Sequence, residues 1–233
     1  MTETIVVDSS SIISLSSNCL LGVLSRLKNE FDVRFVVGRK VLNETVVKAI
    51  ESKKFRLEGF RILELIKSGV IEFVENDEVK SLTDRIIRSC NKCFVAKGNP
   101  IQIIHWGEAE MLALAKHLGA KVVLMDERNT RLFIESPERL RARQEKKLHT
   151  HVKIVSGELD SVKSLIGAVK VVRSIEVGVF AFENGFFSNF ENESLLNLDN
   201  KRQRILAGLL WSLKLKGCAV SVEEIDSYLN LIK

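Results

Sequence analysis

Short apolar runs alternate with amphipathic stretches through most of this chain. Runs at about residues 5–7, 33–37 and 121–125 have the length and the valine-rich composition of strands buried on both faces. Between them, apolar residues recur three and four positions apart, which is typical of helices that bury one face. Strands alternating with helices predict a parallel sheet with right-handed crossovers, and therefore an α/β fold.

The same pattern gives the expected order of elements. We expect helices over about residues 11–28, 39–52, 55–68, 79–93 and 107–118, with short strands at 70–74 and 152–155 and a basic helical stretch up to about 147. After Gly157 the pattern is mainly helical, and Ser221 with Glu224 forms a capping box for the last helix. We therefore expect an α/β domain over residues 1–155. Residues 156–233 would be a mainly helical extension that packs on it or forms a dimer contact.

Four acidic residues fall where such a fold would bring them to one edge of the sheet. Asp8 and Asp126 directly follow apolar runs, Glu44 follows the second strand, and Glu108 begins a helix. Open α/β sheets bind ligands outside the carboxyl ends of their strands. Clustered carboxylates repel and raise one another's pKa unless a cation joins them, and oxygen ligands suit Mg²⁺ or Mn²⁺. The four acids are therefore candidate metal ligands.

Each of these acids also has a structural interpretation. Asp8 and Asp126 stand where an aspartate commonly caps the following helix. Glu44 lies beside an apolar helical stripe, where a solvated glutamate is the default. In Gly-Glu-Ala-Glu at residues 107–110, both glutamates suit the first turn of a helix. Glu108 lies three and four residues before apolar positions, so we expect it to face inward as a ligand, and Glu110 to face solvent or support the site indirectly.

The charge of the chain permits a nucleic-acid partner without establishing one. The formal net charge is +5 and the isoelectric point is near 9.0. Arg128 and Arg131 are candidates for holding a substrate phosphate, although exposed helix arginines are equally expected. Ser9 and Ser10 either start a helix or bind a phosphate or a metal-bound water. The basic run at residues 139–147 is a solvated helix face or a track for an RNA backbone.

Trp106 and the cysteines carry weaker signals. Trp106 either stacks on a base or belongs to the core. Cys90 and Cys93 form a single C-x-x-C motif, and a zinc site would need a second pair such as His149 and His151. We expect reduced thiols and no zinc. No apolar stretch is long enough to span a membrane and the first residues do not form a signal peptide, so the expected location is cytoplasmic, with no membrane partner.

The order of these motifs resembles the PIN domain family. Val-Val-Asp-Ser-Ser ends at Ser10, a glutamate follows the second strand, Gly-Glu-Ala-Glu precedes an alanine-rich helix, and Asp-Glu-Arg follows the next strand. The resemblance covers about residues 5–155. It implies a Rossmann-like, three-layer PIN fold with a central parallel sheet, and a metal-dependent nuclease that usually acts on RNA. The metal-binding acids of the family would be Asp8, Glu44, Glu108 and Asp126.

The Gly-Glu-Ala-Glu form is similar to a mainly prokaryotic branch of the family. That branch includes archaeal proteins and the toxin ribonucleases of toxin–antitoxin pairs, which makes a protein antitoxin or inhibitor, or a second copy of the chain, a possible partner. Two features depart from the common pattern: Asp-Ser-Ser stands where Asp-Thr-Asn or Asp-Thr-Ser is frequent, and the chain is much longer than a compact toxin.

The expected function is therefore a metal-dependent endoribonuclease that cleaves RNA phosphodiester bonds. A non-catalytic RNA-binding or RNA-processing adaptor with the same fold is the alternative. A receiver-like phosphoryl-transfer protein with Asp8 as acceptor fits less well, because the sequence shows neither an acidic neighbour of Asp8 nor a lysine at a strand end. Nucleotide binding through a glycine-rich loop is disfavoured because the corresponding motifs are absent from the sequence.

Overall fold

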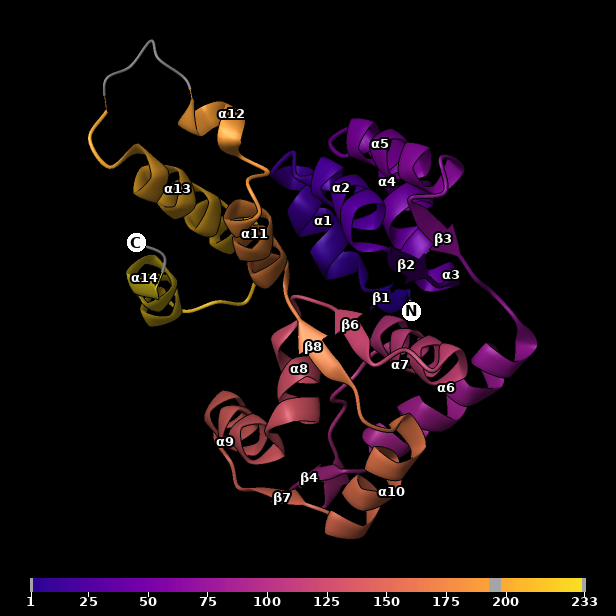
Figure 1. The fold of residues 1–233 in the computed structure, drawn as a ribbon. Helices are drawn as coiled ribbons and strands as arrows, with labels where there is room; N and C mark the ends of the chain where they lie inside the picture. The colour runs from indigo at the N-terminus through magenta and orange to yellow at the C-terminus, as the bar shows by residue number, and fades with distance from the viewer. Residues whose placement is uncertain (1, 193–197, 232–233) are drawn as a thin grey trace.

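A parallel sheet of five strands forms the centre of the molecule (Figure 1), as seen in a computed structural model that describes residues 2–192 and 198–231. The strand order is β3-β2-β1-β6-β8, and every neighbouring pair is parallel. The strands are β1 (Glu3–Val7), β2 (Val33–Val37), β3 (Ile71–Phe73), β6 (Val122–Leu124) and β8 (Lys170–Val172). The predicted α/β class with a central parallel sheet is confirmed.

Both faces of this sheet are covered, which explains the apolar runs. Successive residues point to opposite faces: Val6 and Val123 belong to one hydrophobic cluster, whereas Val7 and Leu124 belong to the other. The helices on the Val7 face are α1 (Ser9–Ser17), α2 (Leu21–Phe31), α5 (Arg56–Lys67), α11 (Ser174–Glu183), α13 (Lys201–Leu215) and α14 (Val222–Leu231). Those on the Val6 face are α6 (Asp77–Cys90), α7 (Trp106–Leu118), α8 (Arg128–Glu135), α9 (Pro137–Leu148) and α10 (Ser156–Ile166). The result is a three-layer fold.

A second, small sheet lies away from the central one. It is antiparallel, in the order β5-β4-β7, with β4 at Phe94–Ala96, β5 at Asn99–Pro100 and β7 at Val152–Ile154. The strand expected near residue 152 therefore exists, but it pairs with a hairpin of β4 and β5 that we did not predict. Lys97 and Gly98, both with positive φ, form the turn of that hairpin.

Three helical stretches are divided where a single helix was expected. Residues 11–28 form α1 and α2, separated near Cys19, which has a left-handed φ of 57°. Residues 39–52 form α3 (Arg39–Leu42), the π-helical turn η1 (Asn43–Val47) and α4 (Lys48–Glu51). The basic stretch breaks between Ser136 and Pro137, because a proline has no backbone N–H and fits the first position of a new helix.

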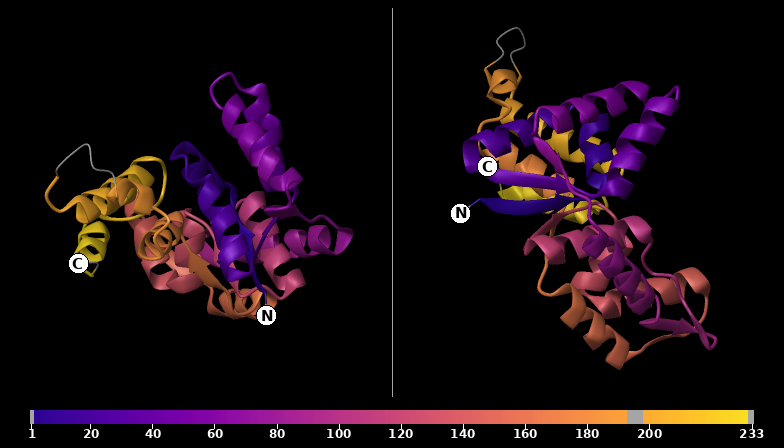
Figure 2. Two further views of the ribbon diagram at one scale, coloured as in Figure 1. Left: turned by 45° about the horizontal axis from the view of Figure 1, so that its top comes forward. Right: turned by 90° about the vertical axis from the view of Figure 1, so that its right-hand side faces the viewer.

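The region after residue 155 contributes a strand as well as helices. We expected it to be mainly helical, but β8 joins the central sheet beside β6. The division at residue 155 therefore does not mark the edge of the sheet. Helices α11 and α13 pack on the same face as α1 and α2 (Figure 2). The short α12 (Ser188–Glu191) lies between α11 and α13 in the chain and contacts α13. Among the described residues, no helix has the length and apolar character that a membrane span requires.

All four cysteines are free thiols. Cys90 and Cys93 are both fully buried. Cys90 is the last residue of α6, whereas Cys93 lies in the turn after it, because the helix ends three residues earlier than expected. Burial raises the pKa of Cys93 to about 12 and that of Cys90 further, so both thiols are protonated at neutral pH. The pair therefore behaves as part of the core.

Candidate functional site

Asp8 lies at the carboxyl end of β1, and its backbone N–H donates to Leu124 O at 2.9 Å. Its side chain caps α1: Oδ2 accepts from the backbone N–H of Ser10 at 3.0 Å and from the Ser10 hydroxyl at 2.5 Å. Only 4% of Asp8 is exposed. Burial raises the pKa of this carboxyl to about 6, and the negative charge of Glu108 adds to the shift. Asp8 is therefore both a helix cap and a perturbed acid.

Three of the four predicted acids line one cavity. This cavity has a volume of about 550 Å³, and we call it the acidic cavity. Its lining includes Asp8, Glu44, Glu108, Lys40, His105 and Trp106. They come from the end of β1, from α3 and η1, and from the start of α7. The topology thus brings together residues that are a hundred positions apart in the chain, as expected for an edge formed by parallel strands.

Each of the other two acids in the acidic cavity has a local partner. Glu108 Oε2 accepts from the backbone N–H of His105 at 3.0 Å and so caps α7. Glu44 Oε1 lies 3.7 Å from Lys40 Nζ, which places a positive charge among the carboxylates. Within residues 2–192 and 198–231, no three His, Cys, Asp or Glu side chains are grouped closely enough to hold a metal ion. A metal at Asp8 would require Glu44 and Glu108 to turn away from these partners.

Asp126 lies at the carboxyl end of β6 but does not line the acidic cavity. Its Oδ1 accepts from the backbone N–H of Ser174 at 2.8 Å, and its Oδ2 accepts from the Ser174 hydroxyl at 2.6 Å. Both residues are buried. Asp126 thus caps α11 rather than joining the other three acids, and its predicted role as a metal ligand stays a prediction.

Glu110 does not face solvent, which was one of the two positions expected for it. It is 8% exposed, and its Oε2 accepts from the backbone N–H of Lys40 at 2.7 Å. Lys40 lines the acidic cavity, so the other expectation, that Glu110 supports the site indirectly, stays a prediction. A Cβ at Gly38 would collide with this carboxylate, so the contact depends on glycine there. Every residue of α7 from Ala109 to Ala115 is buried. The helix therefore has no solvent side at this point, and the stripe argument does not apply.

The two predicted serines have different surroundings. Ser9 lines the acidic cavity. The Ser10 hydroxyl donates to Asp8 Oδ2 and accepts from the backbone N–H of Asp126 at 3.0 Å, so it links the ends of β1 and β6. Ser10 therefore has a clear structural role, whereas Ser9 is placed to meet a ligand.

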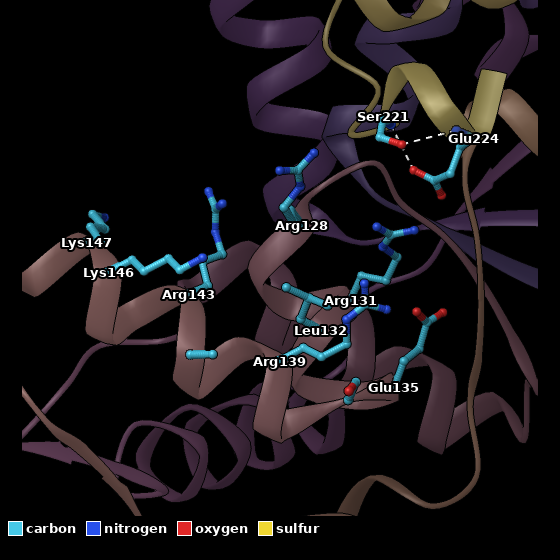
Figure 3. Close-up of a pocket in the computed structure, with 12 residues that line it drawn as sticks. Arg128, Arg131, Leu132, Glu135, Arg139, Arg143, Lys146, Lys147, Ser221 and Glu224 are labelled. Carbon is cyan, nitrogen blue, oxygen red and sulfur yellow. Dashed lines mark hydrogen bonds between the residues drawn. The ribbon is translucent and has the colours of Figure 1, made fainter. Parts of the chain in front are cut away.

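Arg128 and Arg131 line a different and larger hollow of about 1090 Å³, between α8, α9 and the start of α14 (Figure 3). We call it the basic groove, because six arginine and lysine side chains line it. The six cations are Arg128, Arg131, Arg139, Arg143, Lys146 and Lys147.

Sequence reasoning did not identify Lys40 or Ser174. Lys40 stands four residues before Glu44, a spacing at which opposite charges meet on a helix, so this signal was available. Ser174 gave no comparable signal, because its meeting with Asp126 depends on β8, which was not predicted.

The comparisons with known proteins give one family match. The model of a family described as PIN domain matches residues 4–137, which is more than half of the chain. All four predicted acids lie inside this range, which ends at the first residue of α9. No curated protein and no solved structure was found to match.

Proposed function

Because the chain belongs to the PIN domain family, we propose that it is a metal-dependent endoribonuclease. PIN domains are typically nucleases and generally bind divalent metals. The observation that carries the proposal is the meeting of Asp8, Glu44 and Glu108 around one cavity at the carboxyl edge of the sheet. This is where open α/β sheets place their ligands.

The chemistry of these donors fits a hard divalent cation, since all three are carboxylates. Asp8, Glu44 and Glu108 would hold Mg²⁺ or Mn²⁺ once the two glutamates leave their present partners. A metal held there would lower the pKa of a bound water and neutralise charge on the phosphate. Asp8 must first lose its proton, which its pKa of about 6 allows at neutral pH.

Other residues of the acidic cavity suit an RNA substrate. Lys40, released from Glu44, would present its ammonium group to a phosphate oxygen. Trp106 is 42% exposed at the start of α7, and its ring is available to stack on a base. Together they would orient a nucleotide against the carboxylates.

The proposal is tested by incubating the protein with a mixed RNA pool in Mn²⁺ or in EDTA. We expect cleavage only with Mn²⁺, and a loss of about a hundredfold or more in Asp8→Asn, because a neutral amide replaces a carboxylate that would hold the metal. Asp160→Asn makes the same chemical change on the exposed side of α10 and serves as the matched control. Cleavage that persists in EDTA, or an active Asp8→Asn, contradicts the proposal.

One observation favours the non-catalytic alternative. In the described part of the chain, the acids are engaged with Lys40, His105 and Ser174 rather than grouped for a metal. An RNA-binding adaptor would bind the same pool without cleaving it and would bind no Mn²⁺. Calorimetric titration with Mn²⁺ separates the two, since the nuclease should bind the ion through Asp8 and lose that binding in Asp8→Asn.

A further inference from the structure

The charges of α9 divide into a paired and an unpaired set. Arg141 forms ion pairs with Glu138 at 2.9 Å and with Glu145 at 3.1 Å. The cations that α9 contributes to the basic groove recur three and four residues apart, as residues of one helix face do. These cations are Arg139, Arg143, Lys146 and Lys147. None of them forms an ion pair with any described residue, so this face of α9 differs from an ordinary solvated one.

Two further cations on α8 extend this unpaired set. Arg128 and Arg131 rise from α8 toward the side of the groove on which Ser221 and Glu224 lie (Figure 3). Neither forms an ion pair within the parts of the chain that the structure describes. The acids on the groove wall are Glu135 and Glu224, too few to neutralise six cations. The groove therefore concentrates positive charge between α8, α9 and the start of α14.

Arg131 provides an independent sign of a missing ligand. Its Nε atom is buried and has no hydrogen-bond partner among the described residues. Glu224 is within electrostatic range, but its carboxylate is engaged by Arg173 at 2.9 Å and by the backbone N–H of Ser221 at 2.8 Å. Buried donors are nearly always satisfied, and an unsatisfied one is costly. If the Arg131 side chain turns toward the groove, its Nε becomes accessible and can donate to an acceptor oxygen of a ligand, which would remove that cost.

We propose that the basic groove binds the phosphate backbone of a polynucleotide, apart from the acidic cavity. The proposal rests on the proposed function only for the identity of that polynucleotide as RNA. Guanidinium groups match phosphate oxygens in a bidentate manner. From Arg139 to Lys147 the helix advances by about 12 Å, enough to follow more than one phosphate.

The composition of the groove favours a nucleic acid over an acidic protein. Protein interfaces concentrate their binding energy in buried aromatic anchors. The groove offers only Leu132 and Ala142 as apolar lining. Arg128 and Arg131 lie within the family match, whereas Arg139 to Lys147 and the start of α14 lie beyond residue 137, where it ends.

The proposal is tested by fluorescence anisotropy of a labelled single-stranded RNA with the full chain in EDTA at several salt concentrations. We expect the double variant Arg139→Gln/Arg143→Gln to bind at least about tenfold more weakly. The slope of the logarithm of the binding constant against the logarithm of the salt concentration should be shallower by about 1.4, since two phosphate contacts are lost. Arg141→Gln removes a paired charge from the same helix and should bind within about twofold of wild type. Equal binding by the double variant overturns the proposal.

Further arms separate this proposal from the proposed function. Asp8→Asn should bind RNA as wild type does while failing to cleave it. The double variant should cleave poorly at low RNA concentration and recover when RNA is saturating. DNA of the same sequence that binds with the same dependence on the groove supports the backbone site, yet counts against RNA as the particular substrate. Polyglutamate that competes as strongly as RNA overturns the site in favour of an acidic protein.

Discussion

The ends of β1 and β6 present the same local sequence pattern and opposite surroundings. Asp8 and Asp126 each follow a buried strand and precede a helix, α1 or α8. The Asp8 carboxyl lines the acidic cavity, and its pKa is raised to about 6 by burial. The Asp126 carboxylate accepts two hydrogen bonds from Ser174 at the start of α11.

This difference shows that the position of a carboxylate and its availability are determined separately. Topology brings both acids to the same edge of the sheet. Whether either is free to bind a ligand depends on the element that packs next to it. Beside Asp126 that element is α11, which follows β8; beside Asp8 there is the acidic cavity.

The sharpest test applies one substitution at both strand ends. Asp126→Ala should lower the free energy of unfolding by about 3 kcal/mol, because two charge-assisted hydrogen bonds are lost and buried donors of Ser174 remain unpaired. Asp8→Ala should instead raise it by about 1 kcal/mol at about pH 7, since the loss of a cap, about 1 kcal/mol, is outweighed by relief of a buried charge, about 2 kcal/mol. Urea unfolding in EDTA measures both. Equal losses at the two positions would show that the surroundings of the two acids do not differ in energy.

The pH dependence of stability should reveal Asp8 directly. Its pKa is higher in the folded protein, about 6, than its ordinary value of 3.8. The folded state therefore retains a proton that the unfolded state has lost, and stability falls as pH rises from about 4 to about 6. Asp8→Asn lacks this loss, so at about pH 7 it should exceed wild type by roughly 2 kcal/mol, and at about pH 4 by much less.

Urea unfolding of both proteins at the two pH values, in EDTA, measures this difference. A difference between the two proteins that stays constant with pH would show that the Asp8 carboxyl is not perturbed by folding.

The contribution of Ser174 can be sharpened with a smaller change. Ser174→Ala removes the hydroxyl that donates to Asp126 at 2.6 Å but leaves the backbone bond, so it should cost about 1 kcal/mol. The Ser161 hydroxyl donates to Gly157 O on an exposed part of α10, so Ser161→Ala should have almost no effect. Thermal unfolding compares the two. Similar losses of stability in the two variants would mean that the buried hydrogen bond to Asp126 contributes no more than an exposed one.

The smallest effect is expected at Glu110. Glu110→Gln keeps an oxygen that can accept from the backbone N–H of Lys40. Burial raises the pKa of Glu110, so the buried charge that glutamine removes is itself unfavourable. Stability should change by less than about 0.5 kcal/mol. Mn²⁺-dependent cleavage should also be kept, whereas Glu108→Gln should reduce it. If Glu110→Gln loses as much cleavage as Glu108→Gln, the assignment of Glu108 rather than Glu110 as the metal ligand is wrong.

The parts of the fold that the sequence predicted are those fixed by local pattern. Valine-rich runs with buried residues on both faces predicted β1, β2 and β6, and the capping box of Ser221 and Glu224 forms as expected, with bonds of 2.8 and 3.1 Å. In contrast, β8 is as short as β6, but the exposed Lys170 interrupts its apolar run, and its place is determined by pairing with β6. An interrupted run of this length does not stand out as a buried strand.

The candidate site was predictable to a similar extent. Asp8, Glu44 and Glu108 meet because strand topology alone brings them to one edge. The position of Glu110 was not predictable from a helix stripe, since α7 is buried on all sides at that point. The partner of Asp126 lies 48 residues further along the chain, and no local rule reports a contact at that distance.

The position of β8 also determines when the central sheet can be completed during synthesis, because β8 is the last of its five strands in chain order. β6 emerges from the ribosome long before Lys170, and until then its outer edge has no partner strand. Unpaired edges are templates for association with other chains, and parallel pairing between distant segments is slow. The nascent protein therefore has an interval in which four of the five strands of its central sheet have emerged and one edge is unprotected. A ribosome-bound chain that ends before β8 would be the form most prone to aggregation.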